Sequence, residues 1–146
     1  MTSISPFHWR RRVAMRDIDA FAVVWYGNYL QYCDEAATEL LRAFDLAPAS
    51  LPTFGVVPAV VRASCRYLAA ARLDDEVDVR VQVRFERAAR LDFSYEISRA
   101  TDQTILAKIE TTMVLLRQSG ALVYLLPEPL RVRLQALLAA QHRSRP

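Results

Sequence analysis

Two neighbouring segments of alternating polarity constrain the fold more than any other feature of the sequence. In residues 77–86, and again in residues 91–98, every second side chain is apolar and those between are charged or polar. A period of two is typical of antiparallel strands that have one face on a core and the other in water. Because only residues 87–90 separate the two segments, the sequence predicts a hairpin.

A long helix is predicted ahead of these strands, from Asn28 to about Asp45. Its apolar side chains recur at spacings of three and four residues: Tyr29, Tyr32, Cys33, Ala36, Ala37, Leu40, Leu41 and Phe44. So wide a stripe indicates a helix that is covered over most of its surface. Asn28 is a favourable N-cap residue, and Pro48 and Pro52 cannot continue the helical pattern.

Further strands are predicted on both sides of this helix, at residues 7–16, 56–68, 104–117 and 121–126. The first of them places alternate side chains on one face: Phe7, Trp9, Arg11, Val13 and Met15. From Pro127, a short packing helix is indicated by Leu130, Leu134, Leu137 and Leu138.

One strand, one long helix and then four or five strands is an α+β layout. Strands of 10 to 14 residues would be roughly 33–45 Å long, and the helix only roughly 27 Å. The antiparallel sheet, of five to six strands, is therefore expected to curve around a central helix. A chain of 146 residues suffices for a single domain over residues 1–146.

The composition excludes several functional classes. The chain is 53% hydrophobic and 24% charged, with a net charge of +3, which suits an anionic ligand but is too small to predict nucleic-acid binding. Cys33 and Cys65 lack a metal-binding spacing and are expected to be buried thiols, and His8 and His142 are isolated. No signal peptide and no membrane span is predicted, so a cytoplasmic location is expected.

The loop of residues 17–27 contains the most distinctive polar pattern. Two carboxylates, Asp17 and Asp19, lie two residues apart, and an apolar turn separates them from the helix start. A loop aspartate commonly caps a turn through its side chain. From the residues alone, Asp19 is therefore either a turn-capping residue or a catalytic one.

This loop resembles a motif of the 4-hydroxybenzoyl-CoA thioesterase-like family of acyl-CoA thioesterases, which have the hotdog fold. The family motif runs roughly D-x-D-x-x-G-[IVH]-V-[WYN]-[YNH]-x-N-Y, and residues 17–29 read D-I-D-A-F-A-V-V-W-Y-G-N-Y. The segments ARLDDEVDVRVQV and LDFSYEI also resemble the family's third and fourth strands. One departure is Ala22, where the family usually has glycine. If that position needs a positive φ, alanine costs about 1 kcal/mol.

The resemblance implies hydrolysis of an acyl-CoA or acyl-carrier-protein thioester by a homodimer or homotetramer with its sites at a dimer interface. It implies Asp19 as nucleophile or general base, and backbone N–H groups near Tyr26 as the stabiliser of the oxyanion. Asp17 is expected to be structural and to bond loop amides or Arg16. CoA or phosphopantetheine would enter as part of the substrate, and neither a metal nor a redox cofactor is expected.

The same resemblance suggests residues that would bind the substrate. An apolar wall that desolvates Asp19 is expected from Phe21, Val24 and Trp25. Asn28 would either cap the helix or line the pocket, and the cap is the favoured interpretation. The phosphates of CoA need cations at the mouth of the site, for which the candidates are Arg62, Arg66, Arg87 and Arg90.

Two other functions stay open at this point. A non-catalytic protein that binds acyl thioesters could keep the loop without turnover, and Ala22 favours that interpretation. A hydratase or dehydratase on the same fold would require a histidine and a carboxylate on the central helix, and residues 28–45 contain no histidine.

Overall fold

The computed structural model describes residues 7–86 and 89–142 of the chain. Its strands are β1 (Phe7–Arg12), β2 (Val56–Tyr67), β3 (Glu76–Glu86), β4 (Arg90–Arg99) and β5 (Ile105–Arg117). Its α-helices are α1 (Asn28–Ala43) and α2 (Glu128–His142), and its 3-10 helices are η1 (Met15–Asp17) and η2 (Pro48–Phe54).

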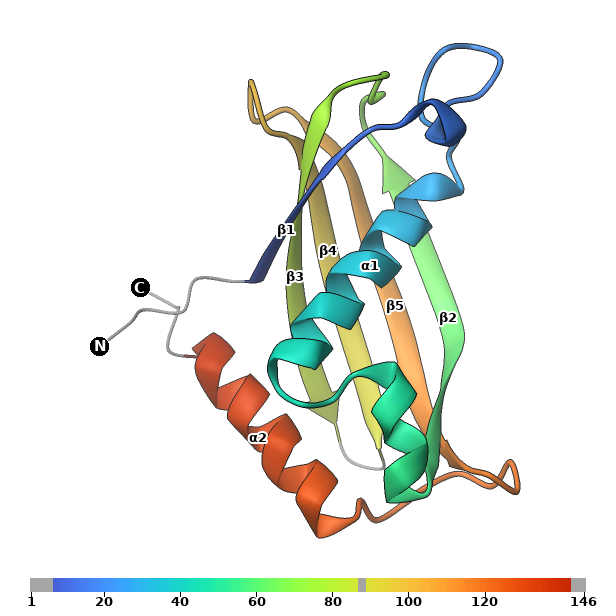
Figure 1. Ribbon diagram of the computed structural model, residues 1–146, viewed down its shortest axis with the longest axis vertical. Coiled ribbons are helices and arrows are strands. Elements are labelled where there is room, and N and C mark those ends of the chain that lie inside the picture. Colours follow the sequence, from blue (N-terminus) through green and yellow to red (C-terminus); the bar gives the residue numbers. More distant parts are fainter. Residues whose placement is uncertain (1–6, 87–88, 143–146) are drawn as a thin grey trace.

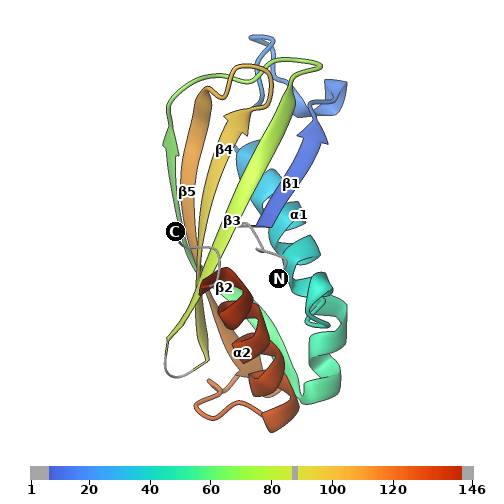
Figure 2. The same cartoon turned by 90° about the vertical axis from the view of Figure 1, so that its left-hand side faces the viewer.

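The strands form one antiparallel sheet in the order β1-β3-β4-β5-β2. The predicted hairpin is confirmed, because β3 pairs with β4 from Val77 opposite Arg99 to Glu86 opposite Arg90. Its apolar side chains lie in the core as the alternation predicted, whereas the polar ones lie on the opposite face. Figures 1 and 2 show both helices on the same face of a long, twisted sheet, so the other face carries no helix.

Helix α1 packs its wide apolar stripe on the inner face of the sheet. Seven of its side chains are buried, as the spacing predicted: Tyr29, Tyr32, Cys33, Ala36, Ala37, Leu40 and Leu41. Burial raises the pKa of the Cys33 thiol, and Cys65 is half-buried; neither cysteine forms a disulfide.

Helix α2 closes the far end of the core, as the leucine spacing predicted. Leu130 and Leu134 line the same small apolar cavity as Leu41 of α1. Near the end of α2, the Gln141 side-chain oxygen accepts a hydrogen bond from Val83 N–H at 3.0 Å. Strand β1 pairs with β3 only as far as Val81, so Gln141 satisfies a donor that has no strand partner there.

One predicted strand and the predicted end of another were wrong. Residues 121–126 form no strand: after Gly120 the chain makes only one bridge, between Leu116 and Leu122, and then leaves the sheet. The sheet therefore has five strands. The first strand ends at Arg12 instead of residue 16, because the chain turns into η1, and Met15 is exposed instead of facing the core.

A buried ion pair causes that turn and fixes the start of the loop. Arg11 lies on the inner face of β1, and its Nη2 donates to Asp17 Oδ2 at 3.0 Å. The two side chains are only 10% and 2% exposed. Asp17 also accepts hydrogen bonds from Ala14 N–H at 2.9 Å and from the Tyr32 hydroxyl at 3.0 Å. Arg11 also donates to Glu35 of α1, so one guanidinium joins β1, η1 and the helix.

This geometry agrees with the structural role expected for Asp17 but changes its main partner. Arg16 Nε lies 3.9 Å from Asp17, farther than Arg11. Burial by itself would raise the pKa of Asp17. The hydrogen bonds from Ala14 and Tyr32, with the charge of Arg11, outweigh it and hold that pKa below its ordinary value.

None of the helices described is long and apolar enough to cross a membrane. Within residues 7–86 and 89–142, no three His, Cys, Asp or Glu side chains lie close enough together to hold a metal ion.

Replacing Asp17 by asparagine should lower the free energy of unfolding by about 3 kcal/mol at pH 7, because Arg11 would keep a buried charge without its partner. The pKa of Asp17 is lower in the folded state. Its stabilisation is therefore complete above the ordinary aspartate value of about 4 and disappears as the pH falls below it. Urea unfolding of wild type and Asp17→Asn from pH 7 to about pH 2 measures both effects.

The exposed pair of Asp102 with Arg99 supplies the control. Asp102→Asn should cost far less stability than Asp17→Asn, because water screens that pair. The assigned role would be contradicted if both variants lost the same free energy of unfolding. It would also be contradicted if the stability difference between wild type and Asp17→Asn did not change with pH.

Candidate functional site

The loop of residues 18–27 is closed by hydrogen bonds at its base, at the N-terminal end of α1 (Figure 1). An antiparallel bridge joins Ile18 to Val24. Trp25 N–H donates to the Asp17 carbonyl oxygen at 3.0 Å, and Val24 N–H donates to the carbonyl oxygen of Ala71 at 2.9 Å. The position of the loop therefore depends on η1, which the buried carboxylate of Asp17 holds.

Ala22 lies at the tip of this loop in the left-handed region, with φ of 61°. Its N–H donates to the Asp19 carbonyl oxygen at 3.1 Å. The position where the family motif has glycine thus needs a positive φ in this chain as well. A side chain there introduces about 1 kcal/mol of backbone strain.

Asp19 is half-buried, and one of its carboxylate oxygens is engaged. Oδ1 accepts a hydrogen bond from Phe21 N–H at 2.8 Å, which is the turn-capping contact that an ordinary loop aspartate makes. Oδ2 has no hydrogen bond to any part of the chain that the structure describes. The turn therefore fixes the carboxylate and leaves one oxygen available.

The backbone at the start of α1 supplies unpaired donors. Within the residues described, the N–H groups of Tyr26 and Gly27 donate no hydrogen bond. Gly27 is the N-cap position and has no side chain to cap the helix, so these amides stay available where the positive end of the helix dipole lies. The Tyr26 carbonyl accepts a hydrogen bond from the Tyr67 hydroxyl at 2.8 Å, which ties the junction to the end of β2.

Gly27 is a residue that sequence reasoning missed. The Trp25 ring packs directly over it, and a Cβ at this position would lie 2.1 Å from the Trp25 Cζ3 atom. No other residue fits under the ring unless the ring moves. The chain has only three glycines. The signal that could have identified Gly27 is its position directly after two aromatic residues and directly before the predicted helix.

The apolar wall expected around Asp19 is not assembled by the residues that the structure describes. The Phe21 side chain is 84% exposed, and Trp25 and Tyr26 are also exposed. Val24 is buried in the core, so it supports the loop and does not line an open surface. Desolvation of Asp19 by its neighbours would need a further surface to cover these aromatic side chains.

Asn28 is not the N-cap residue of α1, which was its favoured interpretation. It is the first residue of α1, and Gly27 before it occupies the N-cap position. The Asn28 side-chain Nδ2 turns back to donate to the Asp17 carbonyl oxygen at 2.8 Å. The N-cap expectation was therefore wrong, because the residue is already helical and its amide stabilises the preceding loop.

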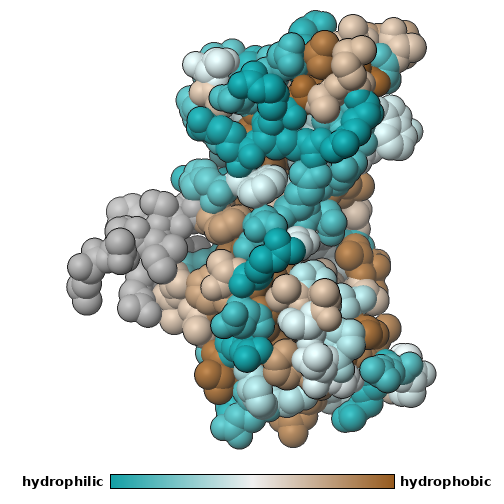
Figure 3. Space-filling view, viewed as in Figure 1, coloured by the Kyte–Doolittle hydropathy of each residue, from teal (hydrophilic) through white to brown (hydrophobic). Residues whose placement is uncertain are grey.

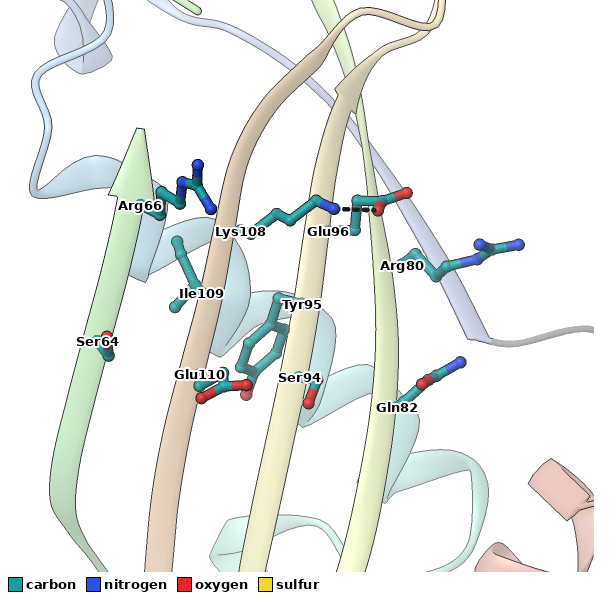
Figure 4. A pocket seen from close by; sticks show the side chains of 10 residues that line it. All are labelled: Ser64, Arg66, Arg80, Gln82, Ser94, Tyr95, Glu96, Lys108, Ile109 and Glu110. Carbon is teal, nitrogen blue, oxygen red and sulfur yellow. Dashed lines mark ion pairs between the residues drawn. The ribbon is translucent and has the colours of Figure 1, made fainter. Parts of the chain in front are cut away.

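The candidate arginines do not surround this loop. Arg62 and Arg90 line one hollow, and Arg66 lines a second. Both hollows lie on the face of the sheet opposite α1, and Figure 4 shows the second. Arg87 is outside the residues described. The structure thus brings three of the four candidates to one face of the sheet, but not the face of Asp19.

Substitution Ala22→Gly should raise the free energy of unfolding by up to about 1 kcal/mol, because relief of left-handed strain exceeds the added freedom of the unfolded chain. Ala20, in the same loop, is exposed and has no positive φ. Ala20→Gly should therefore destabilise by about 0.5 kcal/mol. Urea unfolding of both variants measures the contrast, and a loss of stability in both would refute the strain at Ala22.

Comparison with known proteins places this geometry in a family. Residues 13–134 match the family described as the thioesterase-like superfamily. The chain is 32% identical over 108 residues to the acyl-CoA thioester hydrolase YbgC of Escherichia coli O6:H1 (strain CFT073), covering 74% of this chain and 80% of that protein. It is 30% identical over 128 residues to the 1,4-dihydroxy-2-naphthoyl-CoA hydrolase of Synechocystis sp. (strain PCC 6803), covering 86% and 92%.

A solved structure shows the same fold. Slr0204, a 1,4-dihydroxy-2-naphthoyl-CoA thioesterase from Synechocystis, has a TM-score of 0.80 at 27% identity and covers 88% of this chain and 95% of its own. The hotdog fold implied by the loop motif is therefore confirmed, with five strands. Since the family match extends over most of the sequence, the chain belongs to the thioesterase-like superfamily.

Proposed function

We propose that this protein hydrolyses an acyl-CoA thioester to a free acid and CoA, with Asp19 as the reacting carboxylate. The observation that carries the proposal is the junction of loop and helix, where a fixed carboxylate with one available oxygen and two unpaired amides belong to one hydrogen-bonded loop. Relatives that act on acyl-CoA or dihydroxynaphthoyl-CoA support the substrate class.

Two routes use the same groups. In the first, Asp19 Oδ2 attacks the thioester carbonyl, the C–S bond breaks, and the CoA thiolate leaves and takes a proton from water. Water then opens the mixed anhydride and restores the carboxylate. In the second, Asp19 removes a proton from a water molecule that attacks the carbonyl, and returns the proton to the leaving thiolate. Both routes form a tetrahedral oxyanion, which the amides of Tyr26 and Gly27 would stabilise.

A second copy of the chain would complete the site. Strand β2 is at the edge of the sheet; Val60 and Val61 are exposed along it, and Leu68 is exposed just after its end. Figure 3 shows hydrophobic side chains along the right-hand edge of the molecule, where Figure 1 places β2. An exposed edge strand with apolar side chains favours pairing with another strand, and the simplest partner is the same strand of a second copy related by a twofold axis.

Such a pairing would also cover the exposed aromatic residues of the loop. In an antiparallel pair the start of one β2 lies beside the end of the other, and the end of β2 carries Tyr67, which bonds to Tyr26. The second copy would therefore approach the loop and cover Phe21 and Trp25. Covering them would remove water from Asp19, which a carboxylate needs in order to be an effective nucleophile or base at neutral pH.

The leaving group could equally be the phosphopantetheine of a carrier protein, since the loop contacts only the acyl and thioester parts in this scheme. We expect the chemistry to need no cofactor beyond the CoA or phosphopantetheine of the substrate. A hydratase or dehydratase is less compatible, because α1 contains no histidine.

Release of free thiol from a panel of acyl-CoAs tests the assignment. Asp19→Asn and Asp19→Ala should each lower turnover by at least roughly 100-fold, the effect of removing a general base or nucleophile. Glu128→Gln, an exposed carboxylate on α2, should retain wild-type turnover. Full activity in both Asp19 variants would disprove the role of Asp19.

The alternatives give other results with the wild type. Tight binding without thiol release from any CoA or carrier-protein thioester would indicate a non-catalytic binding protein. Hydration of an enoyl thioester without hydrolysis would indicate the hydratase.

The dimer has its own test. Val61→Glu places a charge on the β2 edge and should shift the protein toward monomer in sedimentation experiments, with a parallel loss of thiol release. Val132→Glu on α2 is the matched control, because Val132 is 53% exposed and Val61 is 61% exposed. A wild-type monomer with full turnover would rule out the shared site.

A further inference from the structure

The face of the sheet opposite α1 carries a groove of about 390 Å³ (Figure 4). That volume lies in the range of small-molecule sites. The groove is lined by strands β2, β3, β4 and β5, and no helix covers it. It therefore lies on a different surface from the loop of residues 18–27.

The groove follows from the register of the strands. One cross-strand row consists of Arg80, Glu96, Lys108 and Arg66, each opposite the next. The second row, two residues farther along each strand, consists of Gln82, Ser94, Glu110 and Ser64. The third consists of Arg84, Asp92, Thr112 and Arg62. The groove lies between the first and second rows. A separate, smaller hollow lies between the second and third rows and shares Ser94 and Glu110 with the groove.

The outer rows contain more cationic than anionic side chains. Within the residues described, the side chains of Arg62, Arg66, Arg80 and Arg84 form no hydrogen bond or close ion pair, although Arg84 lies opposite Asp92 and interacts with its charge. Lys108 lies 3.7 Å from Glu96, and Arg90 lies 3.1 Å from Asp92.

Two cations lie directly opposite each other on neighbouring strands. Arg66 is directly opposite Lys108 in the ladder between β2 and β5. Like charges in this position destabilise a sheet, and a bound anion would relieve the repulsion.

The lining selects a phosphorylated ligand. Guanidinium groups form paired, charge-assisted hydrogen bonds with phosphate oxygens. Hydroxyl, amide and carboxylate groups also line the groove, together with Tyr95 and Ile109. The outer rows are four residues apart along a strand, or roughly 13 Å, which suits a ligand with phosphates and a polar body. Glu110 would repel a phosphate, but it can accept a hydrogen bond from a ribose hydroxyl or a base amine.

We propose that this groove and the adjoining hollow together bind the phosphates of a nucleotide, with the ribose or base over the serine row that they share. Two sources share that chemistry: the 3′,5′-ADP part of CoA, and a free adenine nucleotide. The site is on the opposite face of the sheet from Asp19, so its occupation does not depend on the proposed hydrolysis.

Isothermal titration calorimetry of the full chain with 3′,5′-ADP, 5′-ADP, ATP and adenosine tests the proposal. Phosphorylated probes should bind, and adenosine should bind at least about tenfold more weakly, because it lacks the charge-assisted contacts. Raising NaCl from about 50 to about 500 mM should weaken binding through screening. Tighter binding of 3′,5′-ADP assigns CoA as the source, and tighter binding of 5′-ADP or ATP assigns a free nucleotide.

Paired variants locate the site. Arg66→Ala with Arg80→Ala, and separately Arg62→Ala with Arg84→Ala, should each lower affinity at least about tenfold. The matched control is Arg10→Ala with Arg12→Ala. It removes two arginines from the same sheet, but these are already paired with Asp78 and Glu76. Thermal unfolding of every variant verifies that it is folded.

Three results would overturn the proposal. The first is a wild type that binds none of the phosphorylated probes. The second is an equal loss of affinity in the control variant. The third is a wild type that binds no nucleotide, together with a groove variant whose sedimentation coefficient differs from that of the wild type. That result would make this face a contact between copies. A chain that fails to hydrolyse any thioester but binds nucleotides in the groove would leave the proposal intact.

Discussion

The ion pair between Arg11 and Asp17 is the interaction on which the candidate site depends. It lies almost out of contact with water, and it draws in the Ala14 amide, the Tyr32 hydroxyl and Glu35. These partners come from β1, η1 and α1, so a single charged group sets where the strand ends and how the chain enters the helix. A buried charge is tolerated only when it is paired and hydrogen-bonded, and the same bonds that satisfy Asp17 hold the base of the loop.

Downstream of that anchor the loop stays open to solvent. Its backbone is closed by a bridge and hydrogen bonds, yet Phe21, Trp25 and Tyr26 expose large apolar surfaces, and the amides of Tyr26 and Gly27 lack partners within the described chain. Apolar rings and unpaired amides gathered at one junction are typical of a site that another surface covers and a ligand enters. In the proposed pairing of two copies, the edge strand β2, joined to the loop through Tyr67, would bring that second surface.

The two faces of the sheet have contrasting chemistry. The inner face is apolar and packs on α1, whereas the outer face presents rows of arginine and lysine around short polar side chains. Period-two alternation produces both faces from the same strands. As a consequence, the candidate arginines at positions 62, 66 and 90 face away from the loop, because each lies at a strand position whose side chain points to the outer face.

Periodicity and a local motif are properties of neighbouring residues, so the sequence alone predicted five of the strands, the central helix, the hairpin and the identity of the loop. It also indicated that Ala22 would be strained if the loop needed a positive φ, and φ at Ala22 is positive. The missed elements depended on contacts across the chain. The end of β1 at Arg12, the helical position of Asn28 and the lost strand at 121–126 follow from a buried ion pair, a side chain that turns back to a loop carbonyl, and a single bridge. Which polar side chains meet could not be predicted from the sequence, because partners such as Arg11 and Glu35, or Arg66 and Lys108, are far apart along the chain and are brought together by packing and strand register.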